Sequence, residues 1–348
     1  MTATGAGLEG ATAAEYRLRR MTPEGTHSAG GELPRAVSIR EVGPRDGFQN
    51  EPEVIPTERK IELIDALART GLRRLEATSF VRADVIPQLA DAAQVLAGID
   101  VPAEVSVSVL IPNERGLDAA LALRDSVAGG RPAFDEINVF MSASESHNRK
   151  NVNRSTAESL AGLEAVLGRA RAEGLRCEGV ISTSFGCPYE GPVPPQRVLE
   201  IAARLRDAGA EEIGFGDTTG MANPRQVREF FVLAQDWLGE GAQGEGGVEL
   251  TAHFHNTRGQ GLANVLAALE AGVESFESSF GELGGCPVPA GATGNIASED
   301  LVSMLHEMGV ETGIDLDALL ACARRVQEIL GRPLGSHTLV AGPVDWRA

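Results

Sequence analysis

The segment AVSIREVGPRDGFQNEPEVIPTERKIELIDALARTG (36–71) decides the fold. It begins with an alternating, β-branched run that is typical of a strand and continues through a loop crowded with polar residues. It ends in residues at helical spacing, with Ile61, Ile64 and Leu67 on one face and Gly71 as a stop signal. The segment therefore predicts one unit of strand, loop and helix.

The same order recurs eight times in about 275 residues, which is the size of a (β/α)8 barrel. The expected strands are VSIREV (37–42), RRLEATS (73–79), EVSVSVL (104–110), EINVFMS (136–142), RCEGVIS (176–182), EEIGFGD (211–217), ELTAHFH (249–255) and ESFESSF (274–280). A doubly wound sheet would end after roughly six strands and favour a glycine-rich phosphate fingerprint, which we do not find. The pattern predicts an α/β protein with a TIM barrel over residues 36–309.

The two ends of the chain lack the repeated pattern of strand, loop and helix. Residues 1–35 are rich in Gly, Ala, Thr and Ser without lasting periodicity, which predicts a disordered tail, with Met21 as an alternative start. Residues 310–348 contain one amphipathic helical pattern (315–331) and a Gly/Pro-rich ending. We expect this region to pack on the barrel or to contribute to an oligomer interface.

Composition excludes several classes of partner. The chain of 348 residues has 31 basic and 49 acidic residues, a formal net charge of -18, so nucleic acid and anionic membranes would repel it. No apolar run approaches the roughly 20 residues that a membrane span needs. Four cysteines without a CxxC pair predict neither a disulfide framework nor a zinc knuckle. We expect a cytoplasmic protein that binds a small molecule.

Polar residues gather where the expected strands end, and in a TIM barrel the active site lies at those carboxyl ends. They are Arg45 and Asp46 after the first strand, Glu76 and Ser79 at the second, MSASESHNRKN (141–151) at the fourth, GCPYEG (186–191) after the fifth, Asp217 at the sixth, His253 and His255 at the seventh, and GELGGCPVPAGATGN (281–295) after the eighth. This distribution predicts an active site at the barrel mouth.

The histidines of AHFHN (252–256) are the most informative of these residues. Positions two apart on a strand point to the same side, so both imidazoles would face the mouth together. With carboxylate and amide oxygens, for which we nominate Asp46 and Asn295, they would suit a divalent ion such as Mg²⁺, Mn²⁺ or Zn²⁺. The alternative is that one histidine packs in a barrel layer and the other bonds a loop.

Arg45 and Glu76 are charged residues with two interpretations each. Arg45 beside a metal-binding Asp46 would be a fixed cation for a carbonyl or enolate oxygen, and its alternative is a solvated surface charge. Glu76 interrupts an apolar strand, and a buried carboxylate is costly unless it is paired, so we expect Arg45 as its partner. A purely structural salt bridge is the alternative for that pair.

The four cysteines differ in their surroundings. Cys286 lies in LGGCP, a glycine-rich context unlike that of a core thiol. Cys177 on a strand and Cys322 on a helix are expected in the core, and Cys187 is ambiguous.

These motifs together resemble a known family. REVGPRDGFQNE, EATSFV, KNVNRS, GCPYEG, GDTTGMANP, HFHNTRGQGLANVLAALEAGV, GELGGCP and GATGNIASEDLV are similar, in order, to 3-hydroxy-3-methylglutaryl-CoA (HMG-CoA) lyases. These lyases belong to a group of metal-dependent barrels that also includes isopropylmalate and homocitrate synthases. The similarity runs from about residue 36 to 335.

The resemblance implies a role for each matching position. It implies metal ligands at Asp46, His253, His255 and Asn295, a catalytic arginine at Arg45, an acid/base cysteine on a mobile lid at Cys286, and further motif acids at Glu41, Glu76, Asp217 and Glu299. Asp46 or a histidine of the pair would act as the base, while Gln49, Asn50 and Ser79 would orient the substrate.

The implied activity is a retro-Claisen cleavage of HMG-CoA, or of a related 3-hydroxy-3-alkylglutaryl-CoA, with Mg²⁺ or Mn²⁺ as cofactor. The implied partners are an acyl-CoA substrate and a second copy of the chain in a homodimer. The size of the C3 substituent stays open, because Asn256 and Arg258 depart from the family pattern. The alternatives are a condensing enzyme of the same superfamily and a catalytically silent barrel that serves as a scaffold.

Overall fold

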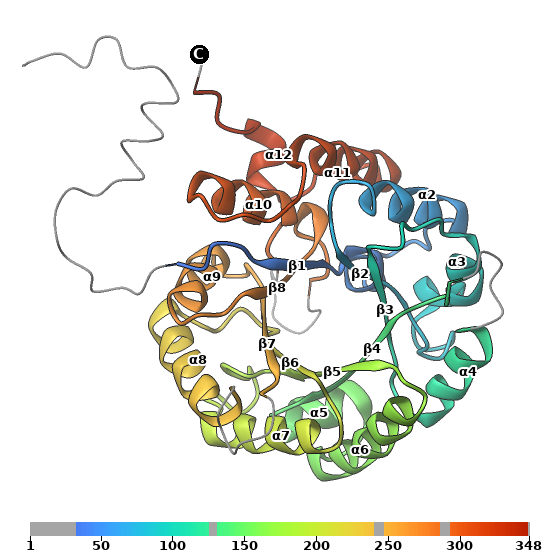
Figure 1. Ribbon diagram of the computed structural model, residues 1–348, viewed down its shortest axis with the longest axis vertical. Helices are drawn as coiled ribbons and strands as arrows, with labels where there is room; N and C mark the ends of the chain where they lie inside the picture. Colours follow the sequence, from blue (N-terminus) through green and yellow to red (C-terminus); the bar gives the residue numbers. More distant parts are fainter. Residues whose placement is uncertain (1–32, 125–130, 240–246, 286–292, 347–348) are drawn as a thin grey trace, which may run out of the picture.

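The computed structural model describes residues 33–124, 131–239, 247–285 and 293–346, and it contains a closed barrel of parallel strands (Figure 1). The strands pair in sequence order, and the last pairs with the first. They are β1 (Ser38–Glu41), β2 (Arg74–Ser79), β3 (Ser106–Leu110), β4 (Glu136–Ser142), β5 (Arg176–Ser182), β6 (Glu212–Asp217), β7 (Glu249–Phe254) and β8 (Ser275–Ser278). The predicted TIM barrel is confirmed.

Helices form a ring outside the strands (Figure 1). They are α2 (Thr57–Leu67), α3 (Ala92–Gly98), α4 (Glu114–Arg124), α5 (Glu145–Val152), α6 (Thr156–Ala172), α7 (Pro195–Asp207), α8 (Pro224–Leu238), α9 (Gly261–Glu270), α10 (Ser298–Glu307), α11 (Leu316–Leu330) and α12 (His337–Ala341). The apolar core lies between this ring and the strands. Phe215 on β6, for example, meets Phe230 and Phe231 of α8 edge-on.

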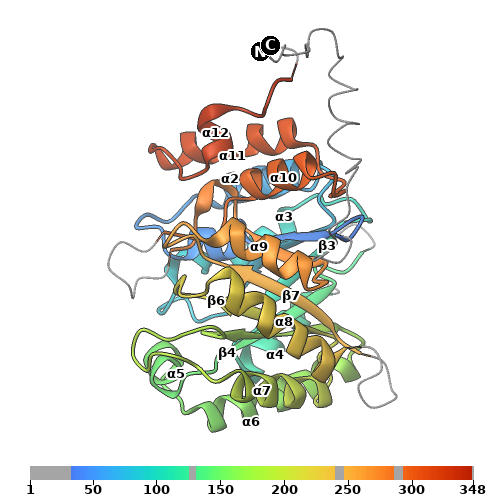
Figure 2. The same ribbon diagram turned by 90° about the vertical axis from the view of Figure 1, so that its left-hand side faces the viewer.

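The C-terminal helices form an extra layer at one side of the barrel. Figures 1 and 2 show α10, α11 and α12 gathered together, with α11 beside α2. Helix α11, in the region predicted to pack on the barrel, contacts α2. The boundary predicted after residue 309 lies between α10 and α11, and the division of the chain there stays a prediction. The predicted tail lies outside the described residues except for 33–35. Within the described part of the chain, no helix is long and apolar enough to cross a bilayer.

The interior of the barrel is charged rather than apolar. The guanidinium of Arg40 is bonded to four carboxylates from other strands. The buried charged residues of this cluster are Arg40, Arg74, Glu136, Glu178, Glu212 and Glu277. Of the interior charges, only Glu76 was singled out from the sequence. The overlooked signal is that charged residues alternate with apolar ones along strands whose neighbouring helices are amphipathic, so the charged side must face inward.

Gly43, directly after β1, tests how tightly the barrel mouth is packed. A Cβ at this position would lie 2.4 Å from Phe280 Cε1 and 2.7 Å from Glu41 Oε1. We expect Gly43→Ala to lower the melting temperature by roughly 3–8 °C, because overpacking typically costs about 1–3 kcal/mol. Gly168→Ala on α6 is the matched control, since a Cβ there meets nothing within 4 Å.

Differential scanning fluorimetry of both variants checks this expectation. Gly168→Ala should leave the melting temperature unchanged or raise it slightly, because alanine favours a helix interior over glycine. A Gly43→Ala protein as stable as the wild type would contradict the packing account.

Candidate active site and metal centre

A short π-helical turn (Gly43–Gly47) carries Arg45 and Asp46. The turn follows β1 directly, and its Asp46 amide donates to the carbonyl of Val42 (2.7 Å). Single π-helical turns are rare and often mark functional sites. The break in the regular strand is therefore what sets these two side chains at the mouth.

The Glu41 carboxylate ties this turn to the chain that follows β8. It accepts from the amide of Gly43 (2.7 Å), the amide of Phe280 (3.1 Å) and the hydroxyl of Ser298 (2.6 Å). Burial raises the pKa of Glu41 to about 7, although these three donors oppose the rise. Glu41 thus connects both halves of the site without facing its centre.

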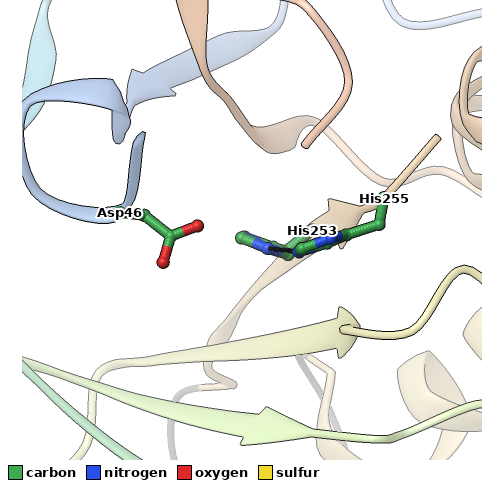
Figure 3. Close-up of side chains that lie close together, drawn as sticks. All are labelled: Asp46, His253 and His255. Atoms are coloured by element: carbon green, nitrogen blue, oxygen red, sulfur yellow. Dashed lines mark hydrogen bonds between the residues drawn. The ribbon is translucent and has the colours of Figure 1, made fainter. Parts of the chain in front are cut away.

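Asp46, His253 and His255 form a cluster whose candidate ligand atoms all lie within 4.8 Å of one another. Figure 3 shows the Asp46 carboxylate directed toward the two imidazoles, which lie side by side. The Nε2 atoms of the histidines are 3.2 Å apart. The two histidines thus meet at one point with a carboxylate, as a shared metal site requires, and their role as metal ligands stays a prediction.

Asn295, nominated as a ligand from its loop, is hydrogen-bonded to this cluster. Its Nδ2 donates to Asp46 Oδ2 (2.7 Å) and to the Leu283 carbonyl (3.0 Å). Its Oδ1 is buried and has no hydrogen-bond partner in the described part of the chain. A buried amide oxygen without a donor, in the residue that pairs with His255, is available as an oxygen ligand for a cation.

The two histidines of the cluster differ in protonation. At His253, burial is outweighed by Glu277 and Asp46, which raise its pKa, so a cation would have to displace a proton there. Burial lowers the pKa of His255 to about 3, so its imidazole is neutral at physiological pH, as a metal ligand must be. Burial alone would raise the pKa of Asp46, but Arg45 and the two histidines outweigh it and the pKa is lowered. The donor set of two nitrogens and two oxygens therefore fits a divalent ion, and it does not select the element.

Arg45 is locked in place by two carboxylates. Its Nε donates to Glu76 Oε2 (2.6 Å) and its Nη1 to Asp46 Oδ1 (2.7 Å). The Arg45 side chain is only 11% exposed, so the interpretation as a solvated surface charge is wrong. Glu76 has the partner that the sequence suggested.

Asn138 is a member of this arrangement that was not predicted from the sequence. Its Nδ2 donates to Glu76 Oε1 (2.5 Å), the oxygen that Arg45 does not use. Asn138 sits two residues after Glu136 on β4, so both point into the barrel. A polar residue at an inward position of a strand is the signal that could have found it.

Asp217 and Ser79 end their strands with free acceptors. Asp217 Oδ1 accepts from the amides of Met221 (2.8 Å) and Ala222 (3.1 Å), while Oδ2 is buried without a partner in the described residues. Burial raises the pKa of Asp217 to about 7. The Ser79 hydroxyl is likewise buried and unpartnered within the described chain.

The remaining predicted residues surround the loop after β8. Gln49 is half-buried, and the exposed Asn50 donates to the carbonyl of Gly285 (3.0 Å), so Asn50 contacts the base of that loop. Gly284 has a positive φ of 88°, and a Cβ there would lie 2.8 Å from Asp46 Oδ2, which explains why a glycine passes the cluster here. Cys286 lies outside the described residues.

The three other cysteines are buried, as expected for Cys177 and Cys322. The ambiguous Cys187 is also buried, and its sulfur accepts from the Ser144 hydroxyl at 3.0 Å. None of these three therefore lies free at the barrel mouth.

Comparison with known proteins agrees with this geometry. A family model described as HMGL-like matches residues 36–326. The chain belongs to the HMGL-like family. Among the relatives of this HMGL-like protein, the hydroxymethylglutaryl-CoA lyase YngG of Bacillus subtilis is 45% identical over 308 residues, covering 88% of this chain and 97% of the relative. The cytoplasmic 3-hydroxy-3-methylglutaryl-CoA lyase of Danio rerio is 44% identical, covering 88% and 86%.

Solved structures extend the likeness of the HMGL-like protein to three dimensions. An HMG-CoA lyase from Acinetobacter baumannii, solved in complex with coenzyme A and 3-methylmalate, superposes with a TM-score of 0.82 at 38% identity. The superposition covers 90% of this chain and 97% of that one. The resemblance inferred from the motifs is confirmed.

The buried Glu299 of the HMGL-like protein predicts how the stability of the fold changes with pH. Its carboxylate is fully buried and accepts from the Gly281 amide (3.0 Å), and burial, with the charge of Glu41, raises its pKa to about 8. The folded state therefore binds more protons than the unfolded state between the ordinary glutamate pKa of 4.5 and about 8. Stability should fall as the pH rises through that window.

We expect Glu299→Gln, which keeps an acceptor oxygen, to raise the melting temperature at pH 8.5 by at least roughly 2 °C and to have little effect at pH 5. Thermal melts between pH 5 and 9 check this, with Glu53→Gln at an exposed position as control. An equal shift at both pH values would contradict the assignment.

Proposed function

We propose that the protein is a divalent-metal-dependent carbon–carbon lyase that cleaves HMG-CoA, or a related 3-hydroxy-3-alkylglutaryl-CoA, to acetyl-CoA and acetoacetate or the matching 3-oxo acid. One observation carries the proposal: the Arg45 guanidinium is locked by Glu76 and Asp46 directly beside the imidazole cluster. The positive charge of Arg45 is thereby fixed next to the candidate site for a divalent metal ion. The names of the relatives as lyases support the same activity.

The reaction breaks the bond between C2 and C3 of the substrate. The C3 hydroxyl loses its proton, its oxygen becomes the carbonyl of the 3-oxo acid, and the electron pair of the C2–C3 bond moves onto the thioester as an enolate. C2 then takes up a proton to give acetyl-CoA, so atoms and charge balance without an oxidant. Asp46, His253, His255 and Asn295 would hold the divalent ion, which lowers the pKa of a hydroxyl that it binds.

Arg45 supplies the charge that the enolate needs. Its guanidinium is held by two carboxylates before substrate arrives, so little reorganisation is required as negative charge develops on the thioester oxygen. Losing one such preorganised donor typically costs about 3 kcal/mol, roughly a hundredfold in rate. The Asn138 bond to Glu76 helps to keep the guanidinium in place.

Two carboxylates near the imidazoles are able to accept the hydroxyl proton. Burial raises the pKa of Asp217 to about 7, whereas Arg45 and the histidines outweigh burial at Asp46 and lower its pKa. Asp217 is therefore the more basic of the two near neutral pH, and it replaces Asp46, which was expected from the resemblance, as the proposed acceptor. Its Oδ2, which has no partner in the described chain, is the atom available for this.

The proton for C2 is assigned by the family resemblance to Cys286, and this role stays a prediction. Asn50 donates a hydrogen bond to the carbonyl of Gly285, the residue before Cys286. The backbone of Gly284 packs closely against Asp46. The start of the predicted lid is therefore in contact with the cluster.

Partners and location follow as finer proposals. The coenzyme A bound to the Acinetobacter baumannii lyase supports an acyl-CoA substrate. Mg²⁺ or Mn²⁺ as the ion and a homodimer as the assembly stay predictions. A cytoplasmic location also stays a prediction, because relatives of similar identity carry the words cytoplasmic and mitochondrial in their names.

Incubation of the purified protein with HMG-CoA and Mg²⁺ or Mn²⁺ tests the activity. We expect acetyl-CoA and acetoacetate in equal amounts, and loss of both products with EDTA. A condensing enzyme would instead release free CoA from acetyl-CoA and a 2-oxo acid, and a silent barrel would do neither. Either result would overturn the proposal, and a series of 3-alkyl homologues of HMG-CoA would define the substituent.

Arg45→Gln should lower kcat by about a hundredfold or more, because the enolate loses its cation. Metal content and melting temperature should stay close to those of the wild type. Arg59→Gln, which removes an exposed ion pair with Glu62 on α2, is the control. Near-normal turnover by purified Arg45→Gln would remove the enolate role.

A further inference from the structure

A line of hydrogen bonds leads from the metal cluster into the charged interior of the barrel. His253 Nδ1 lies 2.7 Å from Glu277 Oε2, and the other oxygen of Glu277 accepts from Arg40 Nη1 at 2.9 Å. Glu277 and Arg40 are both at most 2% exposed. Neither residue was among the candidates from sequence, and neither belongs to the cluster itself.

The register of the barrel builds this line. Arg40 of β1 pairs with Glu277 of β8, and His253 of β7 pairs with the same Glu277. Paired residues on neighbouring parallel strands point to the same face, so the three side chains stand side by side inside the barrel. Their contact is therefore a consequence of strand closure and not of a flexible loop.

The Glu277 carboxylate and the His253 imidazole play different parts in their hydrogen bond. A carboxylate only accepts hydrogen bonds, so the proton between Glu277 and His253 belongs to Nδ1 of the imidazole. When the imidazole is neutral, as it must be to bind a metal ion, its lone pair is then on Nε2, the atom that faces His255 Nε2 at 3.2 Å. A metal-binding histidine commonly donates its other N–H to a carboxylate, which fixes its tautomer and its ring orientation.

We propose that Glu277, held by Arg40, is a positioning residue that keeps His253 in the Nδ1–H tautomer and directs its Nε2 at the divalent ion. The proposal rests on the metal centre of the proposed function and assigns a task to the charged interior below it. Arg40 has this effect because its other bonds, to Glu178, Glu136 and Glu212, anchor the guanidinium to three further strands. Glu277 consequently cannot turn away from His253 without leaving its own partner.

The chain offers a matched pair of variants for the test. Glu277→Gln removes the charge that favours Nδ1–H and leaves Arg40 with its three other carboxylates. Glu178→Gln removes a carboxylate from the same Nη1 of Arg40, is equally buried, and lies on β5, where its ion-pair partner is Arg40 and not a residue of the metal cluster. Both substitutions keep the size of the side chain, so their effects on packing are comparable.

The measurement is Mn²⁺ affinity of the metal-free full-length protein, by titration calorimetry or by the electron paramagnetic resonance of free Mn²⁺. We expect Glu277→Gln to weaken Mn²⁺ binding roughly 10–100-fold and Glu178→Gln to bind within about twofold of the wild type. Equal affinities of wild type and Glu277→Gln, or an equal loss in both variants, would overturn the positioning role. A wild type that does not bind Mn²⁺ would overturn the proposed metal centre together with it.

A second measurement does not depend on substituting Glu277 or any other residue of the charged interior. In the Mg²⁺-loaded protein labelled with ¹⁵N-histidine, the His253 ring, assigned with His253→Ala, should show its proton on Nδ1. A ring protonated on Nε2 would overturn the proposal even if Glu277→Gln failed to fold.

Discussion

The parallel pairing of β8 with β1 is the contact on which the site depends. It runs from Ser38 opposite Ser275 to Glu41 opposite Ser278, and it closes the barrel. Closure brings Asp46, just after the first strand, within hydrogen-bond distance of Asn295, 249 positions further along the chain. Glu41 strengthens the same seam, because its carboxylate accepts from the amides of Gly43 and Phe280 on the two sides. Without closure, the Arg45 guanidinium, the two imidazoles and the Asn295 amide oxygen would lie on separate segments of the chain.

The charged interior has an energetic requirement of its own. Removing an ion from water costs several kcal/mol even after relaxation, so each buried charge must find excellent partners. Arg40 meets this condition by bonding four carboxylates, and Arg74 shares Glu136 and Glu212 with it. Such a cluster is weak evidence for stability, since well-packed apolar residues often serve as well. Its contribution here is geometric, because it fixes the Glu277 carboxylate next to the His253 imidazole.

Much of the fold was predictable because it is local. Each strand begins and ends within one or two residues of its predicted bounds, since β-branched runs, polar loops and amphipathic helices alternate regularly along the chain. The pair His253 and His255 was predictable from strand periodicity, and Glu76 from the cost of a lone buried carboxylate. Asn138, Glu277 and Arg40 were not found, because a charged or polar residue on a strand can face water or the barrel interior. The two cases separate only when the strand is considered together with the amphipathic helices that cover its apolar side.

The sequence by itself determined the eight strand–helix units and the crowding of polar residues at the strand ends, because both follow from short-range periodicity. Only the tertiary structure decided which of these residues meet. The π-helical turn aims Arg45 at Glu76, and the strand register places Glu277 between Arg40 and His253. The physical reason is that register depends on how distant strands close around a shared interior, and shifting a strand by one residue would turn its charged side chains to the opposite face.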